Sequence, residues 1–288
     1  MAKLDILQAD WSDYQLIDSG NRRKLERFKD TLLIRSEPKA WWAPDTDKEQ
    51  WGRAVAEFDD VSKRWKYFGR KVQPNWDMEL FGLRFQARLT DMSKHLGVFP
   101  EQEPHWSWMH QKIREANREI RFLNLFGYTG VASLVAASAG AKVTHVDASK
   151  PAIAWGRENQ QRSSIGEAPI RWILDDALKY ARREIRRKSS YEAIILDPPS
   201  FGRGPNGEVW KVEEQIADLM QLCKELLSDK PLFVVVTMYN LEASALMVQN
   251  LISSVFKAGV CQSGELVLPH QFSTKVLPLS LYTRWIAS

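Results

Sequence analysis

Cysteine is scarce in this sequence: Cys223 and Cys261 are the only two among 288 residues. They lie far apart in the chain, and neither belongs to a Cys-x-x-Cys pair or to a Cys/His pattern with metal-ligand spacing. We therefore expect no disulfide framework and no metal site. Such cysteine usage is typical of the reducing cytosol, so we predict a cytoplasmic protein.

Long apolar segments are missing as well. No run approaches the length of about 20 residues that a membrane-spanning helix requires. Residues 1–20 contain acidic and polar side chains where a signal peptide would be apolar, so no membrane contact is expected. Strong charge of one sign is also lacking, because the formal net charge is only +4 at pH 7. This mild basic excess is compatible with nucleic acid as a partner without indicating it.

Tryptophan, in contrast, is abundant and unevenly placed: eight of the twelve lie before residue 110. The same region contains short segments with strand-like alternation, whereas Asp45–Phe58 has helical polarity. The predicted strands are Tyr14–Ile17, Thr31–Ile34, Trp65–Phe68 and Leu80–Leu89. We predict a Trp-rich, mostly β accessory or substrate domain over residues 1–95 and a second domain over residues 96–288. The Trp41-Trp42 pair is interpreted either as core or as a platform for stacked bases.

The stretch from Arg121 to Asn159 has the pattern of a nucleotide-binding βαβ unit. Its predicted elements are a buried strand at Phe122–Phe126, a glycine turn at Gly127–Gly130, a helix at Val131–Ser138 and a second strand at Lys142–Val146. The turn is expected where a side chain would block a ligand. The second strand ends at Asp147, whose carboxylate is well placed to accept both hydroxyls of a ribose.

The glycine turn also indicates which nucleotide fits. A dinucleotide site requires Gly-x-Gly-x-x-Gly, so that several backbone amides approach a pyrophosphate. Here the turn contains only Gly127 and Gly130, and Tyr128 adds bulk between them. An adenosyl group without phosphates fits better, and S-adenosylmethionine is therefore the predicted cofactor. The alternative is that both glycines only form the turn.

Two further strands are expected to bring acidic side chains to the same edge of the sheet. Ile170–Leu174 is followed by Asp175 and Asp176, and we expect Asp176 to accept a hydrogen bond from the adenine amine. Alternatively, either aspartate is the N-cap of the helix predicted over Leu178–Lys188.

The next strand, Tyr191–Leu196, is followed by Asp197-Pro-Pro-Ser-Phe201. Consecutive prolines fix the backbone and remove two amide donors, so a carbonyl is left pointing outward. That carbonyl and the Asp197 carboxylate can accept hydrogen bonds from an amino group, and Phe201 can stack on a flipped base. The following segment, Gly202–Gly207, is predicted to be a mobile loop. It is either a cover over the substrate, with Arg203 on a phosphate, or an ordinary surface turn.

The end of the chain discriminates between variants of the α/β fold. Strands are expected at Glu265–Leu268 and Leu281–Ile286, and the residues between them include two prolines and no helical pattern. A parallel crossover requires a longer connection, so these strands should form an antiparallel hairpin.

Three of these stretches, Leu123–Gly130, Val146–Ser149 and Asp197–Phe201, together resemble class I S-adenosylmethionine-dependent methyltransferases. The sequence looks most like the branch of bacterial large-subunit ribosomal RNA methyltransferases that make 5-methylcytosine or 7-methylguanine, over about residues 80–288. The resemblance implies an α/β, Rossmann-like sheet of seven strands whose last strand is antiparallel.

The resemblance also implies roles for individual residues. Those implied to bind the cofactor are Phe126, Gly127, Thr129, Gly130, Asp147, Ala148, Ser149, Asp176 and Ala177. Asp147 would hold the ribose, and Asp176 with Ala177 would meet the adenine. Gln102 is added from the segment Val98–Gln102, which is similar to a segment near the cofactor in relatives. Asp197 and Pro198 would face the methyl group and its acceptor, and with Phe201 they form the predicted catalytic set.

One departure from these relatives bears on the acceptor. Members that methylate cytosine C5 use a cysteine just after the fifth strand, whereas this chain has Thr237-Met-Tyr-Asn240 there. Cys223 and Cys261 do not obviously replace that thiol, so we predict methylation of a nitrogen of RNA, with ribosomal RNA favoured. A second departure is that the N-terminal region lacks the usual RNA-binding modules, so RNA is predicted from kinship. Alternatives are a methyltransferase for a protein side chain or small molecule, an inactive RNA-binding module and, least favoured, a hydride-transfer enzyme.

Overall fold

The computed structural model describes residues 4–69, 72–163, 165, 170–239 and 242–288. The chain divides into two compact units. The first unit contains Met1–Ile6, His105–Glu265 and Ser280–Ser288, and the second contains Leu7–Pro104 and Leu266–Leu279. The division predicted at residue 95 stays a prediction, and the two units are described separately. Among the described residues, no helix is long and apolar enough to cross a membrane.

The first unit is built on an eight-stranded sheet in the order β1-β16-β17-β15-β12-β9-β10-β11. Its strands are β1 (Leu4–Gln8), β9 (Arg121–Leu125), β10 (Lys142–Asp147), β11 (Ile170–Leu174), β12 (Ala193–Leu196), β15 (Phe233–Met238), β16 (Val260–Pro269) and β17 (Val276–Ile286). Strands β9 to β12 and β15 pair in parallel, and β17 pairs antiparallel with β15. These pairings confirm the predicted α/β sheet with its antiparallel last strand.

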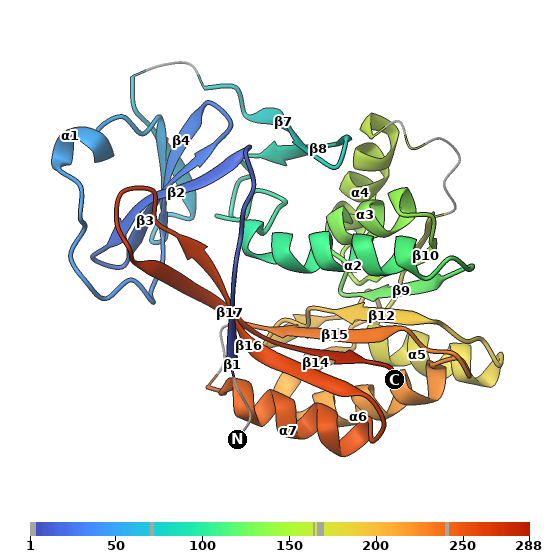
Figure 1. The fold of residues 1–288 in the computed structure, drawn as a ribbon. Helices are drawn as coiled ribbons and strands as arrows, with labels where there is room; N and C mark the ends of the chain where they lie inside the picture. The colour runs from blue at the N-terminus through green and yellow to red at the C-terminus, as the bar shows by residue number, and fades with distance from the viewer. Residues whose placement is uncertain (1–3, 70–71, 164, 166–169, 240–241) are drawn as a thin grey trace. The chain divides into compact units, whose positions relative to one another are not determined.

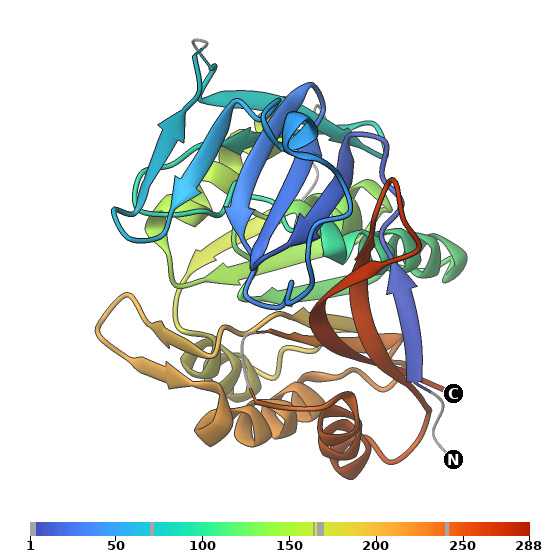
Figure 2. The same ribbon diagram turned by 90° about the vertical axis from the view of Figure 1, so that its left-hand side faces the viewer.

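One strand of this sheet was not predicted. Strand β1 lies beside β16 at the edge and extends the seven predicted strands to eight (Figure 2). The β1 backbone approaches β16 so closely that a Cβ at Gly264 would overlap the Asp5 carbonyl oxygen. Gly264 therefore permits this edge pairing.

Three helices cover each face of the sheet in the first unit (Figure 1). One face carries α2 (Glu103–Glu115), α3 (Val131–Ser138) and α4 (Lys150–Arg162), and the other carries α5 (Ala177–Arg186), α6 (Val212–Leu226) and α7 (Ala245–Val255). Every residue of β12 and β15 is buried as a result. Coverage on both faces explains why these strands are continuous apolar runs rather than alternating ones.

The second unit is mostly β, as predicted. Its main sheet has the order β2-β3-β4-β5-β6, and β7 and β8 form a separate hairpin. The strands are β2 (Tyr14–Gly20), β3 (Arg23–Phe28), β4 (Thr31–Ser36), β5 (Ala56–Asp59), β6 (Arg64–Tyr67), β7 (Asn75–Leu80) and β8 (Leu83–Arg88). Two short helical turns, α1 (Lys48–Trp51) and η1 (Pro100–Gln102), complete the unit.

Two predictions for this unit were wrong in detail. Asp45–Phe58 was expected to be helical, yet only the single turn α1 is. Ala56 instead pairs with Leu33 of β4, a tertiary contact that local polarity does not reveal. Leu80–Leu89 was expected to be one strand, but Leu80 is the last residue of β7 and, after a turn with positive φ at Phe81, β8 covers only Leu83–Arg88.

The Trp41-Trp42 pair separates into two environments. The Trp42 indole nitrogen donates to the Ser19 carbonyl at 2.9 Å, so this ring is tied to the sheet of the second unit. Trp41 is 83% exposed. Only Trp41 therefore has the exposure that stacking on a base requires.

Candidate active site

The register of the parallel strands places four strand ends at one edge of the first unit. Leu125 lies level with Val146 on one side and with Leu196 on the other, and Asp147 lies level with Leu174. The side chains at or just beyond these ends are Phe126, Asp147, Asp176 and Asp197. Strand β9 lies between β10 and β12, so the chain order reverses there, which is where ligands bind in open α/β sheets.

The glycine turn after β9 has a strained backbone. Phe126 and Tyr128 both adopt positive φ angles, 57° and 52°, as does Gly130 at 83°. The turn is closed by hydrogen bonds from the Gly127 amide to the Val146 carbonyl at 3.1 Å and from the Gly130 amide to the Gly127 carbonyl at 3.0 Å. Left-handed conformations cost a non-glycine residue about 1–2 kcal/mol. Two such residues, one on each side of Gly127, mark the turn as a candidate functional segment.

The structure gives the two glycines a packing role. A Cβ on Gly127 would lie 2.3 Å from the His145 ring, and a Cβ on Gly130 would lie 2.5 Å from the Trp172 ring. The sequence suggested that the glycines leave space for a ligand. In the structure, the space that their side chains would take is filled by rings of β10 and β11.

Hydrogen bonds between three buried side chains support the glycine turn. Asn124 Nδ2 donates to Ser133 Oγ at 2.9 Å, and Ser133 Oγ lies 2.9 Å from His145 Nδ1. Burial lowers the pKa of His145 to about 3, so its ring is neutral at physiological pH. These three side chains therefore hold one another in place, and none of them carries a positive charge that would repel a cation.

Asp147 is held by two backbone amides. Its Oδ2 accepts from the Tyr128 amide and its Oδ1 from the Ser149 amide, both at 2.8 Å. Burial raises the pKa of Asp147, while these hydrogen bonds oppose the rise. Each oxygen has a second lone pair for a ribose hydroxyl. Ala148 lies between the two motif residues, and the Ser149 side chain caps α4 by accepting from the Ala152 amide.

The two aspartates that follow β11 have different hydrogen-bond and ion-pair partners. Asp175 accepts from the Asp176 amide through Oδ1, and its Oδ2 lies 2.5 Å from Arg183. Asp176 Oδ1 accepts from the Lys179 amide at 2.9 Å, so Asp176 is the N-cap of α5, the alternative that the sequence left open. Ala177 is the buried first residue of α5. Because Asp175 is engaged by Arg183, Asp176 remains the better candidate for the adenine amine.

The diproline corner after β12 is fixed by a residue that the sequence did not single out. The Trp210 indole nitrogen donates to the Pro199 carbonyl at 2.7 Å, and the Val212 amide donates to the Ser200 carbonyl at 3.0 Å. The Trp210 ring also packs on Phe126 of the glycine turn, with centroids 4.9 Å apart. Buried Trp210 thereby connects the two predicted halves of the site. The sequence signal that could have indicated this role is an aromatic residue, Trp210, shortly after the glycine-rich segment Gly202–Gly207.

The segment Gly202–Gly207, for which the sequence left open a mobile cover or an ordinary surface turn, forms part of a hairpin and its turn. Strands β13 (Phe201–Arg203) and β14 (Val209–Lys211) pair antiparallel, and the Gly204 amide donates to the Glu208 carbonyl at 2.8 Å. Phe201 is 54% exposed at the start of the hairpin. Three-residue strands are too short for a detectable period, so sequence patterns did not reveal them.

The remaining predicted residues have mixed positions. Thr129 is buried, and its carbonyl accepts from the Asn159 side chain at 3.1 Å. Gln102 belongs to η1 of the second unit, so its role at the cofactor stays a prediction. Thr237 and Met238 end β15, whereas Asn240 lies outside the described residues. Burial raises the pKa of the Cys223 thiol to about 12, which makes it a poor nucleophile.

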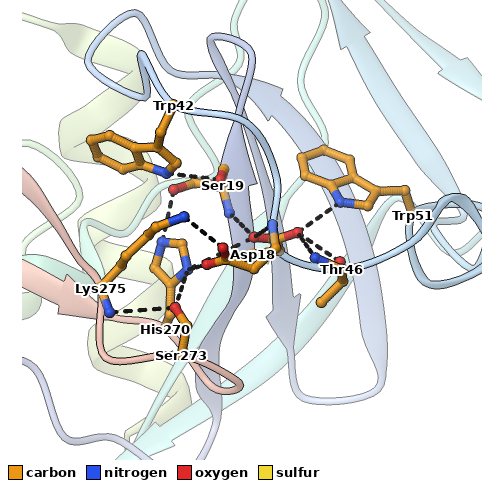
Figure 3. Close-up of polar contacts among 9 residues, drawn as sticks. Asp18, Ser19, Trp42, Thr46, Trp51, His270, Ser273 and Lys275 are labelled. Carbon is orange, nitrogen blue, oxygen red and sulfur yellow. Dashed lines mark hydrogen bonds and ion pairs between the residues drawn. The ribbon is translucent and has the colours of Figure 1, made fainter.

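A second group of polar side chains lies in the second unit (Figure 3). Asp18, Asp45 and His270 offer possible metal-ligand atoms within 4.8 Å of one another. However, Asp18 accepts hydrogen bonds from Thr46 and Trp51, and Lys275 Nζ lies 2.5 Å from Asp45. An ammonium in contact with one carboxylate opposes a metal cation there. The group is better explained as an anchor for the 270–275 turn.

The residues of the first-unit edge fit an adenosyl sulfonium ligand. Asp147, Asp176 and Asp197 lie at or just beyond the ends of β10, β11 and β12, and their negative charge favours a cation over a pyrophosphate. The Tyr128 amide, which a dinucleotide site would aim at phosphate, donates to Asp147 instead. Fold and site together define a class I methyltransferase.

Comparison with known proteins agrees with this class. Residues 6–234 match the family model of S-adenosylmethionine-dependent methyltransferases, and the chain belongs to this family. It is therefore a methyltransferase enzyme whose cofactor is S-adenosylmethionine.

Two curated relatives are ribosomal RNA large subunit methyltransferases K/L. That of Pseudoalteromonas translucida is 34% identical over 153 residues, or 52% of this chain and 21% of the relative. That of Hahella chejuensis is 33% identical over 153 residues, or 52% of this chain and 20% of the relative. The chain thus spans about a fifth of the length of these relatives.

Among solved structures, an S-adenosylmethionine-dependent methyltransferase from Agrobacterium tumefaciens is 42% identical with a TM-score of 0.94. The match covers 100% of this chain and 97% of that one. A methyltransferase from Streptococcus mutans is 17% identical with a TM-score of 0.73, covering 95% and 75% of the two chains. The second likeness concerns the fold alone.

Proposed function

We propose that this methyltransferase acts in the cytosol and transfers the methyl group directly to a nitrogen of an RNA base, with ribosomal RNA as the favoured substrate. The observation that carries the proposal is the diproline corner at Asp197–Phe201, which is held between the glycine turn and the hairpin. The names of the curated ribosomal RNA methyltransferase relatives support RNA as the substrate class.

The corner offers hydrogen-bond acceptors suited to an amino group. Trp210 and the Val212 amide already donate to the Pro199 and Ser200 carbonyls. The two prolines contribute no amide hydrogens, and we assign the role of acceptors for the amino group to the Pro198 carbonyl and the Asp197 carboxylate. An amino group that donates both hydrogens to them turns its lone pair away from the corner. Asp197 is also placed to accept the proton that the nitrogen loses.

Bound S-adenosylmethionine supplies a methyl group on a positively charged sulfur. Transfer from such a centre is an in-line displacement, for which alignment of the nucleophile contributes several orders of magnitude in rate. The chain provides this alignment through rigid elements: the strained turn after β9 on one side and the Trp210-braced corner on the other.

The acceptor atom is a nitrogen because the chain lacks a suitable thiol. Carbon-5 of cytosine becomes nucleophilic only after a thiolate adds to the ring. Thr237 and Met238 end β15 where that cysteine is found in cytosine-5 enzymes, and Cys223 is buried with a raised pKa. An amino or ring nitrogen needs no such covalent activation.

Phe201 completes the acceptor side of the site. Its ring is 54% exposed and directly follows the diproline corner. Enzymes that modify a base extrude it and stack it on aromatic side chains. Phe201 is therefore assigned the stacking role that the sequence suggested.

The test is to incubate the purified protein and labelled cofactor with ribosomal RNA from cells that lack the gene, and to analyse the nucleosides by mass spectrometry. A single N-methylated nucleoside in large-subunit RNA is the expected product. Label in protein or small-molecule fractions, with every RNA fraction unlabelled, would overturn RNA as substrate. A 5-methylcytosine product would overturn the nitrogen assignment.

A further inference from the structure

Basic residues are concentrated in one short segment of the chain. The twelve residues 177–188, which contain α5, include six lysines and arginines and a single acidic residue, for a net charge of +5. The whole chain has a formal net charge of +4, so the other 276 residues sum to −1. The basic character of the protein therefore comes from this segment.

Helix α5 presents these cations on its outer side. Its buried residues are Ala177, Leu178, Tyr180, Ala181 and Glu184. The exposed residues of the segment are Lys179, Arg182, Arg186, Arg187 and Lys188. One face thus packs on the unit while the other is almost entirely basic.

Only some of these cations have acidic partners. Arg183, Arg187 and Lys179 pair with Asp175, Glu184 and Glu208 at 2.5, 2.9 and 3.2 Å. For Arg182, Arg186 and Lys188, no carboxylate of the described residues lies within ion-pair distance. We call these three residues the α5 basic face.

Helix stability alone does not account for this composition. Cations in the last turn favour the helix dipole, but Lys179 lies in the first turn, where a cation is unfavourable. Lys179 and Arg183, and likewise Arg182 and Arg186, are four residues apart, and like charges at this spacing destabilise a helix by a few tenths of a kcal/mol. A polyanionic ligand would remove this repulsion.

The position of α5 connects the basic face to the site. Asp176 caps the helix at the edge where the cofactor strands end, and Lys179 contacts Glu208 of the hairpin that follows the diproline corner. Ten helical residues extend for about 15 Å. Arg182 and Arg186 lie about 9 and 15 Å along the helix from Asp176, so they can meet phosphates of nucleotides that flank a base in the corner, rather than the phosphate of that base.

We infer that the α5 basic face binds phosphates of the substrate RNA and holds the strand while one base enters the site. This inference rests on the proposed function in taking RNA as the substrate. Phosphate contacts of this kind position a nucleic acid without reading its sequence, and each contributes to the salt dependence of binding.

The test compares the double variant Arg182→Gln/Arg186→Gln with the control Lys48→Gln/Lys257→Gln, which removes two exposed lysines elsewhere. Binding of a labelled single-stranded RNA of mixed sequence is followed by fluorescence anisotropy over a series of salt concentrations. Loss of two phosphate contacts should lower the slope of log Kd against log salt by about 1.4 and weaken binding of all sequences alike. The control should keep the wild-type slope, and both variants should keep wild-type affinity for S-adenosylmethionine.

An unchanged slope in the α5 variant would overturn the inference even if RNA is methylated. Wild-type protein that binds acidic lipid vesicles or polyglutamate but not RNA would overturn it as well. RNA binding that depends on the α5 basic face without methyl transfer to RNA would support this surface while refuting the proposed function, so the two failures are distinguishable.

Discussion

Glu26 in the second unit is a fully buried carboxylate and Asp147 in the first unit a half-buried one, and their surroundings differ. Burial works to raise the pKa of Glu26, but Arg35 and Lys24 overcome this effect and lower it to about 2. Arg35 binds both Glu26 oxygens, at 2.7 and 2.8 Å, and Tyr14 donates a third hydrogen bond. The charge of Glu26 is therefore balanced within the fold.

Asp147 lacks such a balance. Burial raises its pKa, and only the amides of Tyr128 and Ser149 oppose this effect. No lysine or arginine among the described residues forms an ion pair with Asp147. Even a half-buried carboxylate without a cation costs some stability, and the cost is recovered when a ligand supplies hydroxyl donors and positive charge. The contrast indicates a structural acid in the second unit, and we propose a binding acid in the first.

The largest effect on stability is expected from removing the charge of Glu26, the ion-pair partner of Arg35. Glu26→Gln leaves the Arg35 guanidinium buried without its counter-charge, which should lower the free energy of unfolding by about 3–5 kcal/mol. Thermal and urea unfolding would measure the loss. The control Glu49→Gln, at an exposed position, should change stability by less than about 0.5 kcal/mol. Equal effects of the two variants would contradict the structural role of Glu26.

Asp197→Asn should have the next largest effect, on catalysis rather than stability. Removing the charged acceptor at the diproline corner should lower kcat by about 10²–10³, as loss of one transition-state interaction does. Calorimetry should show that the affinity for S-adenosylmethionine falls far less than kcat, because Asp147 and Asp176 still supply negative charge at this edge. Asp218→Asn, an exposed change on α6, is the matched control and should retain full activity. If Asp197→Asn methylates at the wild-type rate, the corner is not the acceptor site.

The difference between the units also explains what the sequence could reveal. The edge of the sheet where Phe126, Asp147 and Asp197 lie could be predicted because β9, α3 and β10 have clear periods, and parallel strands bring their ends together wherever they lie in the chain. The ion pair of Glu26 with Arg35 could not be predicted, because these residues meet only through the pairing of β3 and β4.

Short elements were the other source of error. Strand β5 was hidden in a segment of helical polarity, because its pairing with β4 decides its conformation. Trp210 was missed because its role depends on a hairpin of two three-residue strands that places the indole under Pro199. Local patterns do not encode such contacts.

Asp147→Asn is expected to affect stability less than Glu26→Gln and ligand binding more. Loss of charge-assisted hydrogen bonds to the ribose should weaken cofactor binding about 10–100-fold, measured by calorimetry. The ligand-free protein should lose only about 1–3 kcal/mol, less than Glu26→Gln loses, because Asn keeps one of the two oxygens that accept from the Tyr128 and Ser149 amides. A large loss of ligand-free stability would show that Asp147 is structural like Glu26.

The pH dependence of cofactor binding by the wild-type protein also tests whether Asp147 is a binding residue. Because the pKa of Asp147 is raised in the folded state, the folded protein binds this proton more readily than the unfolded chain does. As pH falls toward that raised pKa, the Asp147 contribution to folding should become more favourable, while cofactor affinity should weaken. Titrations of cofactor binding against pH would show the decline, and Asp147→Asn should abolish it. A decline that persists in Asp147→Asn would assign it to another group.

The smallest effect is expected at Trp210, where the first unit offers a matched pair. Trp210 Nε1 donates to the Pro199 carbonyl, and Trp285 Nε1 donates to the Ala258 carbonyl, both at 2.7 Å. Each ring also packs on a phenylalanine, with centroids 4.9 and 5.0 Å apart. Replacing either tryptophan by phenylalanine removes one hydrogen bond, which should cost similar stability of about 0.5–1.5 kcal/mol.

Only Trp210→Phe should also reduce catalysis, because only Trp210 fixes the corner that positions the acceptor. Its kcat should fall about 2- to 10-fold, with the affinity for S-adenosylmethionine unchanged, while Trp285→Phe should keep the wild-type kcat. Steady-state kinetics of both variants, measured well below their unfolding temperatures, separate positioning from stability. Equal kcat values for the two variants would mean that Trp210 contributes only packing, as Trp285 does.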